Sequence, residues 1–546
     1  MDLFIGTLLM ILGAVASNPL AKLLPGRPAL PIVQIAMGAL IGATTNISIM
    51  LDPDLFFLMF LPPLLFLDGW RVPKDDLMRN APTILSLAVG LVVFTVLGIG
   101  FLVNLAIPAI PLAVAFALAS VLAPTDVVAA SAMAKDVVLP RRLLHILEGE
   151  ALFNDASGLV CLRFAVAAAL TGGFSFVDSV GTFVWLALGG IAIGLATTWA
   201  ISWMKLWVAT RYGEDTSSQI LVSLLMPFAA YLSAEQLGCS AVLAAVSAGM
   251  MMSHIEIGGS TLAITRVRRR ALWDTLQFAL NGIVFVLLGE QLPAIVEGAV
   301  RNIQESGHHD AWWLGIYAIG LMLALYALRF IWGWIAVSFS RLLRGPAEER
   351  GRGPDARLIA VMSVAGVRGA VTLAAVLSLP LALPDGSPFP ARDLAIFLAS
   401  AVIVLSLVVA NIALPRLLRG AELPAETPDR RQEIEARIQA AHAAIAAISS
   451  AADSRRKAHP ASSDAGELEA AAAVADIYRR RLQRLAPADP TQLANADPSV
   501  ERQFRLAALR AERARILKMA HDREIGNELA HMLLREIDLG EVPYQN

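Results

Sequence analysis

Residues 117–126 read ALASVLAPTD, an apolar run that ends in a proline, a hydroxyl group and a carboxyl group. Proline has no backbone N–H and its ring clashes with the preceding turn, so the run predicts a helix that breaks at Pro124. Within a bilayer, a broken helix occurs only where it lines a cavity or packs against protein. Thr125 and Asp126, beside freed carbonyls, are then suitable ligands for a hard cation. The alternative is a simple kink, with Asp126 capping the second half of the helix.

The composition of the chain supports a membrane setting for this run. Of the 546 residues, 56% are hydrophobic and 16% are charged, against about 45–50% and about 25% in soluble proteins. Residues 421–546 carry 38 of the charged side chains, whereas the much longer segment 1–420 carries 52. We therefore expect a transmembrane domain over 1–420 and a helical C-terminal domain over 421–546. The net charge of −2 gives no reason to expect a nucleic-acid partner.

Apolar segments long enough to cross a bilayer recur along the first 420 residues. A spanning helix needs about 20 mostly apolar residues. This length predicts thirteen spans, at 3–23, 29–46, 53–70, 81–106, 110–134, 141–171, 178–204, 216–235, 238–254, 271–293, 311–340, 357–380 and 391–417. The predicted fold class is therefore an all-α polytopic membrane protein with about 13 transmembrane helices.

The loops between these spans predict the orientation of the chain. Lys and Arg accumulate in cytoplasmic loops. With the N-terminus periplasmic, the outside loops hold only Arg301 and Arg392. The inside loops hold nineteen basic residues: Lys22, Arg27, Arg71, Lys74, Arg79, Lys135, Arg141, Arg142, Lys205, Arg211, Arg266, Arg268, Arg269, Arg270, Arg341, Arg344, Arg350, Arg352 and Arg357. The C-terminal domain is then cytoplasmic.

The C-terminal segment favours helices at 429–456, 465–486 and 500–540. The first two ranges are rich in Ala, Glu and Arg, which are strong helix formers, and the third is read as a helical pair with an apolar stripe. We interpret the segment as a solvated helical bundle that aids assembly. A regulatory role is the alternative.

The sixth span carries acids in the middle of an apolar segment, where charges are costly and usually functional. Residues 148–158 read EGEALFNDASG. Glu150 and Asn154 are four residues apart and share a helix face. Asp155 lies about fourteen residues into the span, close to mid-membrane. An apolar setting favours the neutral carboxyl, so Asp155 can hold a proton near neutral pH. A fully paired structural acid is the alternative.

The twelfth span contains an arginine between two glycines. Gly366 and Gly369 flank Arg368 closely, and glycine weakens a helix, so this span is a second candidate break. Arg368 needs a carboxylate partner, and Glu150 is our first choice because Asp155 then stays free to exchange ions. Arg163 and Arg329 are further basic residues inside apolar spans.

The two predicted breaks fall at the fifth position of two six-span units, spans 1–6 and 8–13. Because span 7 joins them, the two units have opposite orientations in the membrane. Paired broken helices at matching positions of inverted repeats are the best sequence pointer to a transporter's binding site. We therefore expect two inverted six-helix repeats with discontinuous helices 5 and 12.

At these residues the chain resembles the monovalent cation:proton antiporter-1 family, in its bacterial sodium/proton branch. The resemblance covers roughly residues 1–420. Five motifs carry it in order: Pro62-Pro63-Leu64-Leu65-Phe66, Ala123-Pro124-Thr125-Asp126, Glu150-x-x-x-Asn154-Asp155, Val284-Phe285-Val286-Leu287-Leu288-Gly289 and Gly366-Val367-Arg368-Gly369-Ala370-Val371.

The resemblance implies a homodimer in the bacterial inner membrane that works by alternating access. It makes Asp155 the shared ligand of the proton and the monovalent cation, with Asn154, Thr125 and Asp126 completing the site. Glu150 and Arg368 would form a structural ion pair. An Asn-Asp pair, where electrogenic relatives have Asp-Asp, goes with electroneutral exchange.

Two positions depart from the family pattern. Val127 stands where many members have proline after the Thr-Asp pair. Arg163, eight residues beyond Asp155, is unusual for the wider family, and pairing with an acid near the site is one role for it.

We expect a secondary active transporter that exchanges Na⁺, or alternatively K⁺ or Li⁺, for protons. The alternatives are a gated cation channel and a regulatory protein on a transporter scaffold. Neither an H-E-x-x-H nor a G-x-S-x-G motif occurs. The two isolated cysteines, Cys161 and Cys239, give no metal-binding spacing. We therefore expect no enzymatic activity and no cofactor.

Overall fold

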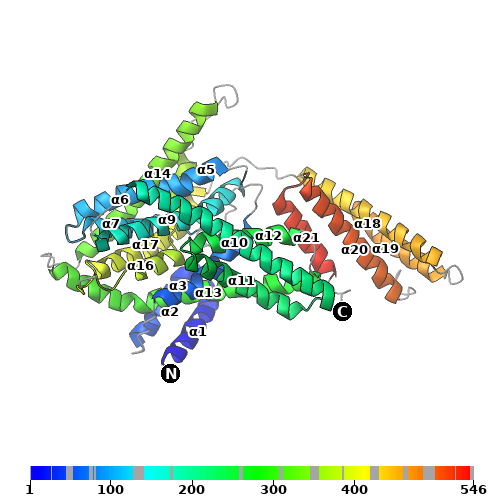
Figure 1. Ribbon diagram of the computed structural model, residues 1–546, viewed down its shortest axis with the longest axis horizontal. Coiled ribbons are helices and arrows are strands. Elements are labelled where there is room, and N and C mark those ends of the chain that lie inside the picture. Colours follow the sequence, from blue (N-terminus) through cyan, green and yellow to red (C-terminus); the bar gives the residue numbers. More distant parts are fainter. Residues whose placement is uncertain are drawn as a thin grey trace.

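The structure is a computed structural model, and its described residues form an array of helices (Figure 1). It describes residues 2–25, 28–44, 53–72, 78, 81–126, 141–171, 176–257, 262–305, 312–344, 356–383, 386–418, 430–458, 465–483, 498–522 and 524–541. The helices of the first 420 residues are α1 (Asp2–Leu23), α2 (Leu30–Thr44), α3 (Pro53–Arg71), α5 (Ala81–Leu85), the π-helix η1 (Ser86–Leu91), α6 (Val92–Ala106), α7 (Leu112–Leu122), α9 (Arg141–Thr171), α10 (Phe176–Tyr212), α11 (Thr216–Gln236), α12 (Ala241–Ile257), α13 (Ala263–Glu305), α14 (Trp312–Arg344), α15 (Ala356–Ala365), α16 (Ala370–Leu377) and α17 (Arg392–Leu418).

Each of the thirteen predicted spans contains at least one of these helices. Within the described residues, eight helical segments are long and apolar enough to cross a membrane, and α2, α7, α12 and α15 are shorter apolar helices. The all-helical fold class is confirmed, and the count of thirteen spans stays a prediction. The twelfth span is interrupted between α15 and α16. The second half of the fifth span, 127–134, lies outside the described residues and so does Val127.

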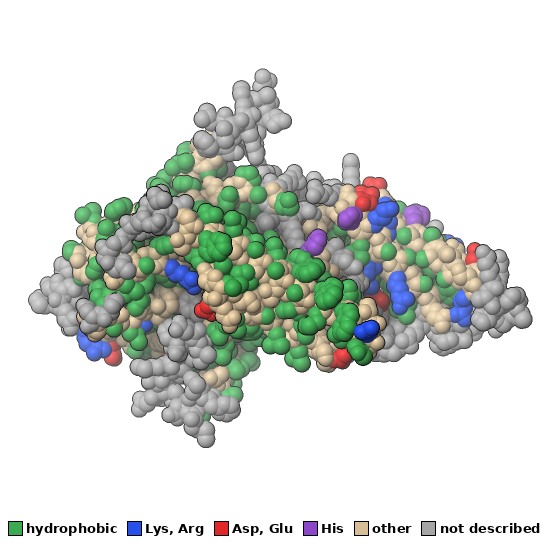
Figure 2. All heavy atoms as spheres, in the orientation of Figure 1, with side chains coloured by type: hydrophobic (Ala, Val, Ile, Leu, Met, Phe, Trp, Pro, Cys, Tyr) green, Lys and Arg blue, Asp and Glu red, His purple; other side chains and the backbone are tan. Residues whose placement is uncertain are grey.

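The outer surface of this helical array is apolar. Along α10, large hydrophobic side chains such as Trp185, Leu188 and Trp199 are exposed. Figure 2 shows hydrophobic side chains spread over this part of the molecule, with few charges among them. Such a surface suits contact with lipid, because monomeric soluble proteins rarely expose large apolar patches.

Reciprocal glycines bring α2 and α13 into backbone contact. A Cβ on Gly38 of α2 would overlap the Val286 carbonyl oxygen of α13, and a Cβ on Gly289 of α13 would overlap the Ile35 carbonyl oxygen of α2. Small residues at membrane helix interfaces allow this close approach. Glycine at both positions is therefore a geometric requirement of the α2–α13 pair.

The α3–α12 pair repeats the same arrangement. Gly69 of α3 lies against the Val246 carbonyl of α12, and Gly249 of α12 lies against the Phe66 carbonyl of α3. In two inverted six-helix repeats, α2 corresponds to α12 and α13 to α3, so the two pairs are equivalents of each other. The pair α6–α7 likewise matches α14–α15, and both pairs are in contact.

The C-terminal helices form a second packed group. They are α18 (Arg430–Ala458), α19 (Ala465–Gln483), α20 (Pro498–His521) and α21 (Asn527–Glu541). These bounds confirm the expected helices, including the helical pair in 500–540. Apolar clusters join α18 to α19 and α20, and join α18, α20 and α21. Figure 1 shows α21 lying between this bundle and the membrane helices, where it contacts α13.

We expect Gly38→Ala to lower the thermal stability of the protein. The new methyl group must push α2 away from α13, and overpacking of this kind costs about 1–3 kcal/mol. Gly315→Ala is the matched control, because nothing lies within 4 Å of its added Cβ and alanine favours helix over glycine. Melting of the detergent-purified protein, followed by tryptophan fluorescence, is the measurement. Equal melting temperatures for the two variants would contradict the packing argument.

Candidate functional site

The segment that follows α7 meets the link between α15 and α16. The chain leaves α7 at Leu122 and continues through Asp126, while Gly366 to Gly369 link α15 to α16. The Asp126 amide donates a 2.6 Å hydrogen bond to the Val367 carbonyl oxygen. A Cβ on Gly369 would overlap the Asp126 carboxyl group, so glycine is needed there for the close approach. The predicted breaks at Pro124 and around Arg368 therefore form one crossing point.

Arg368 binds the carbonyls that the breaks leave without partners. Its Nε donates a 3.0 Å hydrogen bond to the Leu122 carbonyl at the end of α7, and its Nη1 donates to the Gly366 carbonyl just beyond α15. Its backbone amide donates to Ser406 Oγ at 3.3 Å. Both helix C-termini carry partial negative charge, so a buried guanidinium stabilises them.

The expected ion pair between Glu150 and Arg368 is wrong. Glu150 instead binds Arg329 of α14, whose two terminal nitrogens donate to the two carboxylate oxygens at 2.5 and 2.7 Å. Arg329 Nε also donates to the Met362 carbonyl in the last turn of α15, at 3.0 Å. The physical reason is that the Arg368 guanidinium already donates to the Leu122 and Gly366 carbonyls. Arg329 instead has both terminal nitrogens available for the two oxygens of the Glu150 carboxylate.

A short relay connects Asn154 to this ion pair. Asn154 Nδ2 donates to Thr125 Oγ1 at 3.0 Å, and the Thr125 hydroxyl donates to Glu150 Oε1 at 3.3 Å. All three side chains are buried. Asn154 Oδ1 is buried too and has no hydrogen-bond partner among the described residues. The break after α7, the sixth span and α14 are thus tied together by polar contacts.

Asp155 lines a cavity of about 250 Å³ beside this relay. Its side chain is 8% exposed, and within the described part of the chain no hydrogen bond or ion pair joins it to another side chain. Three further acids line the same cavity, namely Asp68, Asp126 and Glu148. The lining is therefore strongly acidic, as a cation site requires.

Arg71 is the one basic residue in the described lining of this cavity. Its guanidinium is held at the rim by Asp274 and by Gln277, whose Oε1 accepts a 2.6 Å hydrogen bond from Arg71 Nη1. Because Arg71 is engaged there, its charge does not neutralise Asp155 directly.

The structure adds lining residues that sequence reasoning missed. Asp68 of α3, Gln277 and Asn281 of α13 and Thr372 of α16 all face the Asp155 cavity. Gln277 and Asn281 are four residues apart in an apolar span and share a helix face. This spacing could have identified them from the sequence as a polar face. Asp68 lies near the end of the predicted span 53–70, where a carboxyl group can also reach the membrane interface, so its position in the sequence does not single it out.

Arg163 lies outside the Asp155 cavity. It lines a second cavity of about 400 Å³ together with Glu235, Tyr231 and Ser240. No ion pair between Arg163 and an acid is found among the described residues. An apolar cluster that includes Leu61, Ala156 and Val242 packs around the helices between the two cavities.

Comparison with known proteins places the chain in a family. The model of the transmembrane region of sodium/hydrogen exchangers matches residues 6–420. The chain therefore belongs to the sodium/hydrogen exchanger family, which confirms the resemblance read from the five motifs and makes it a multi-pass membrane protein.

Relatives and solved structures agree with this assignment. A protein of Escherichia coli K12 described as an uncharacterized Na⁺/H⁺ exchanger, YjcE, is 40% identical over 546 residues, covering 99% of this chain and 98% of the relative. A sodium, potassium, lithium and rubidium/H⁺ antiporter of Bacillus pumilus is 34% identical, covering 100% of this chain and 78% of the relative. The sodium proton antiporter MjNhaP1 of Methanocaldococcus jannaschii shares the fold, with a TM-score of 0.56 at 18% identity over 77% of this chain and 99% of that chain.

We expect Arg329→Gln to destabilise the protein by about 3–5 kcal/mol, because it leaves the Glu150 carboxylate buried without its partner. The double variant Glu150→Gln with Arg329→Gln should recover much of that loss. Thermal unfolding of the wild type, Arg329→Gln, Glu150→Gln and the double variant in one detergent gives the coupling between the two positions. The same cycle for Glu150 and Arg368 should give a smaller coupling energy. A larger coupling there would contradict the Glu150–Arg329 pair and favour the Glu150–Arg368 pair instead.

Proposed function

We propose that this exchanger trades one monovalent cation for one proton at Asp155, without net charge movement. Na⁺ is the preferred cation in this proposal, and K⁺ and Li⁺ are the alternatives. The observation that carries it is the buried Asp155 carboxyl group, which lines an acidic cavity and has no basic partner among the described residues. Membership of the exchanger family supports the reaction class.

Competition at one carboxyl group is enough to couple the two fluxes. A bare buried carboxylate is costly to move past an apolar layer. Either a proton or a cation removes that cost, so either permits the change between inward and outward states. The empty, charged carrier stays where it is, and exchange follows. Raising the pH removes the proton and favours cation loading, so protons and cations compete.

The neighbours of Asp155 have distinct roles in this proposal. Asn154 is neutral and is held through Thr125 to the Glu150–Arg329 pair, so it positions the site without adding charge. Its unpartnered Oδ1 is a suitable cation ligand after a small rotation. Asp126, anchored at the crossing of the breaks, adds a second carboxyl group to the cavity.

Two cavities on either side of an apolar layer support alternating access. The Asp155 cavity takes Glu148, Leu152 and Asp155 from α9, and the second cavity takes Leu159 to Arg163 from the following turns. Asp155 and Leu159 are about 6 Å apart along a helix axis. By the charge pattern of the loops, the Asp155 cavity faces the cytoplasm. The layer around Leu61 and Val242 would be the closed outer gate.

The proposal also includes the membrane, the orientation and the assembly of the protein. Residues 1–420 perform the exchange in the bacterial inner membrane, with the N-terminus periplasmic. Residues 421–546 form a cytoplasmic helical domain, and the working unit is a homodimer. The Bacillus pumilus relative is named for sodium, potassium, lithium and rubidium, which supports testing a series of cations rather than Na⁺ alone.

We expect Asp155→Asn to abolish cation-driven proton movement in proteoliposomes, because the amide can exchange neither ion. Asp522→Asn, an exposed residue at the end of α20, is the matched control and should retain full exchange. The measurement is the change in internal pH after addition of Na⁺, K⁺ or Li⁺. Exchange that survives in Asp155→Asn would refute the single-carboxyl proposal.

Electroneutral exchange should ignore the membrane potential. We expect the Na⁺-driven proton flux to keep its rate when a K⁺ gradient with valinomycin imposes a potential of either sign. A rate that follows the potential would contradict one-for-one exchange. Cation flux that follows the potential and moves no protons would favour a gated channel instead.

A further inference from the structure

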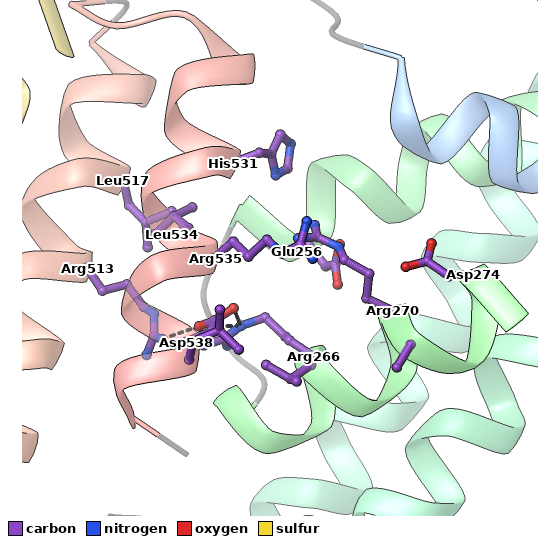
Figure 3. Close-up of a pocket in the computed structure, with 13 residues that line it drawn as sticks. Glu256, Arg266, Arg270, Asp274, Arg513, Leu517, His531, Leu534, Arg535 and Asp538 are labelled. Atoms are coloured by element: carbon purple, nitrogen blue, oxygen red, sulfur yellow. Dashed lines mark hydrogen bonds and ion pairs between the residues drawn. The ribbon is translucent and has the colours of Figure 1, made fainter. Parts of the chain in front are cut away.

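A cavity of about 150 Å³ separates the C-terminal helices from the membrane helices (Figure 3). One wall comes from α12 and the first turns of α13, with Glu256, Arg266, Arg270 and Asp274. The other comes from α20 and α21, with Arg513, His531, Arg535 and Asp538. It shares no residue with the Asp155 cavity.

The acids on the α21 side of this cavity are already bound to arginines. Asp538 accepts hydrogen bonds from Arg266 of α13, with Nε at 2.9 Å, and from Arg513 of α20. Arg513 Nη1 also lies 2.5 Å from a carboxylate oxygen of Glu541. The four side chains form one network across the junction, and two positive charges face two negative charges within it.

The acids on the membrane side of the cavity also form ion pairs with arginines. Glu256 binds the buried Arg269 and accepts a 2.7 Å hydrogen bond from Trp70 Nε1. Asp274 binds Arg71. Each carboxylate in the lining therefore has a direct arginine partner other than Arg270 or Arg535, and Arg270 and His531 act on Glu256 only through their charge.

Arg270 and Arg535 are the basic residues left over. Neither takes part in a hydrogen bond or ion pair with another described residue, although both line the cavity. Figure 3 shows Arg535 extending from α21 and Arg270 from α13 toward the space beside Glu256, with His531 above them. Two guanidinium groups from opposite walls thus add positive charge to a space whose acids are already neutralised.

We propose that this cavity binds a phosphate-bearing anion, which bridges α13 and α21 through Arg270 and Arg535. A guanidinium group matches phosphate oxygens with two parallel donors, and such charge-assisted bonds are strong. The anion is either the headgroup of an anionic lipid or a soluble phosphate compound, since both present the same oxygens. Binding fastens the C-terminal helices to the membrane helices.

Binding to the full-length protein in a neutral detergent tests the proposal without reference to transport. One arm titrates pyrophosphate, and the other titrates dioleoyl phosphatidylglycerol in the same micelles, each followed by thermal shift. We expect at least one of them to stabilise the wild type. The double variant Arg270→Gln with Arg535→Gln should bind it at least about tenfold more weakly, since it loses hydrogen bonds to a charged group.

The matched control is Arg268→Gln with Arg510→Gln, which removes one arginine from α13 and one from the C-terminal helix α20, both outside the cavity lining. It should bind as the wild type does. Pyrophosphate binding alone identifies a soluble ligand, and phosphatidylglycerol binding alone identifies a lipid headgroup. In both cases the ligand should slow hydrogen exchange in α21. Binding of neither compound, or equal binding to the Arg270→Gln/Arg535→Gln variant, would overturn the proposal.

Discussion

The crossing of the segment after α7 with the link between α15 and α16, closed by the hydrogen bond from the Asp126 amide to the Val367 carbonyl, organises the rest of the molecule. Two helices that end inside a membrane expose carbonyls that no water can satisfy. Arg368 satisfies carbonyls at both ends, beside Leu122 and Gly366. The crossing therefore needs a buried positive charge at its centre. The Arg368 guanidinium provides this charge from the link between α15 and α16.

A second arginine extends this arrangement to the candidate cation site. Arg329 joins the end of α15 to Glu150, and Glu150 joins Thr125 and Asn154. Each of these side chains forms a hydrogen bond or an ion pair with a neighbour, and only Asn154 Oδ1 has no hydrogen-bond partner among the described residues. Asp155, one residue further on, points into the acidic cavity instead. Polar neighbours that are held by one another favour ion exchange at Asp155, because they keep their state while this carboxyl group changes its own.

Small residues bring together two helix pairs that correspond to each other in the predicted inverted repeats. Gly38 and Gly289 draw α2 against α13, and Gly69 and Gly249 draw α3 against α12. The two contacts are equivalent under the repeat, and together they support α3 and α13, which contribute Asp68 and Asn281 to the cavity. Close packing without a hydrophobic driving force depends on such contacts, so the glycines help to position Asp68, which directly precedes Gly69, and Asn281, which lies on the same helix as Gly289.

The sequence by itself determined the all-helical class and singled out Asp155 as the candidate exchange residue, because apolar length and costly buried charges are local properties. It also located both breaks, since proline and paired glycines act on their own turns. Only the tertiary structure decided which arginine binds Glu150. Arg329 and Arg368 are both basic residues in apolar spans, and the choice depends on which carbonyls and carboxylates come within hydrogen-bond distance when distant helices cross. The sequence could not show that Asp68, Gln277 and Asn281 line one cavity, for the same reason. Residue spacing shows which side chains share a helix face, but packing between helices decides what that face contacts.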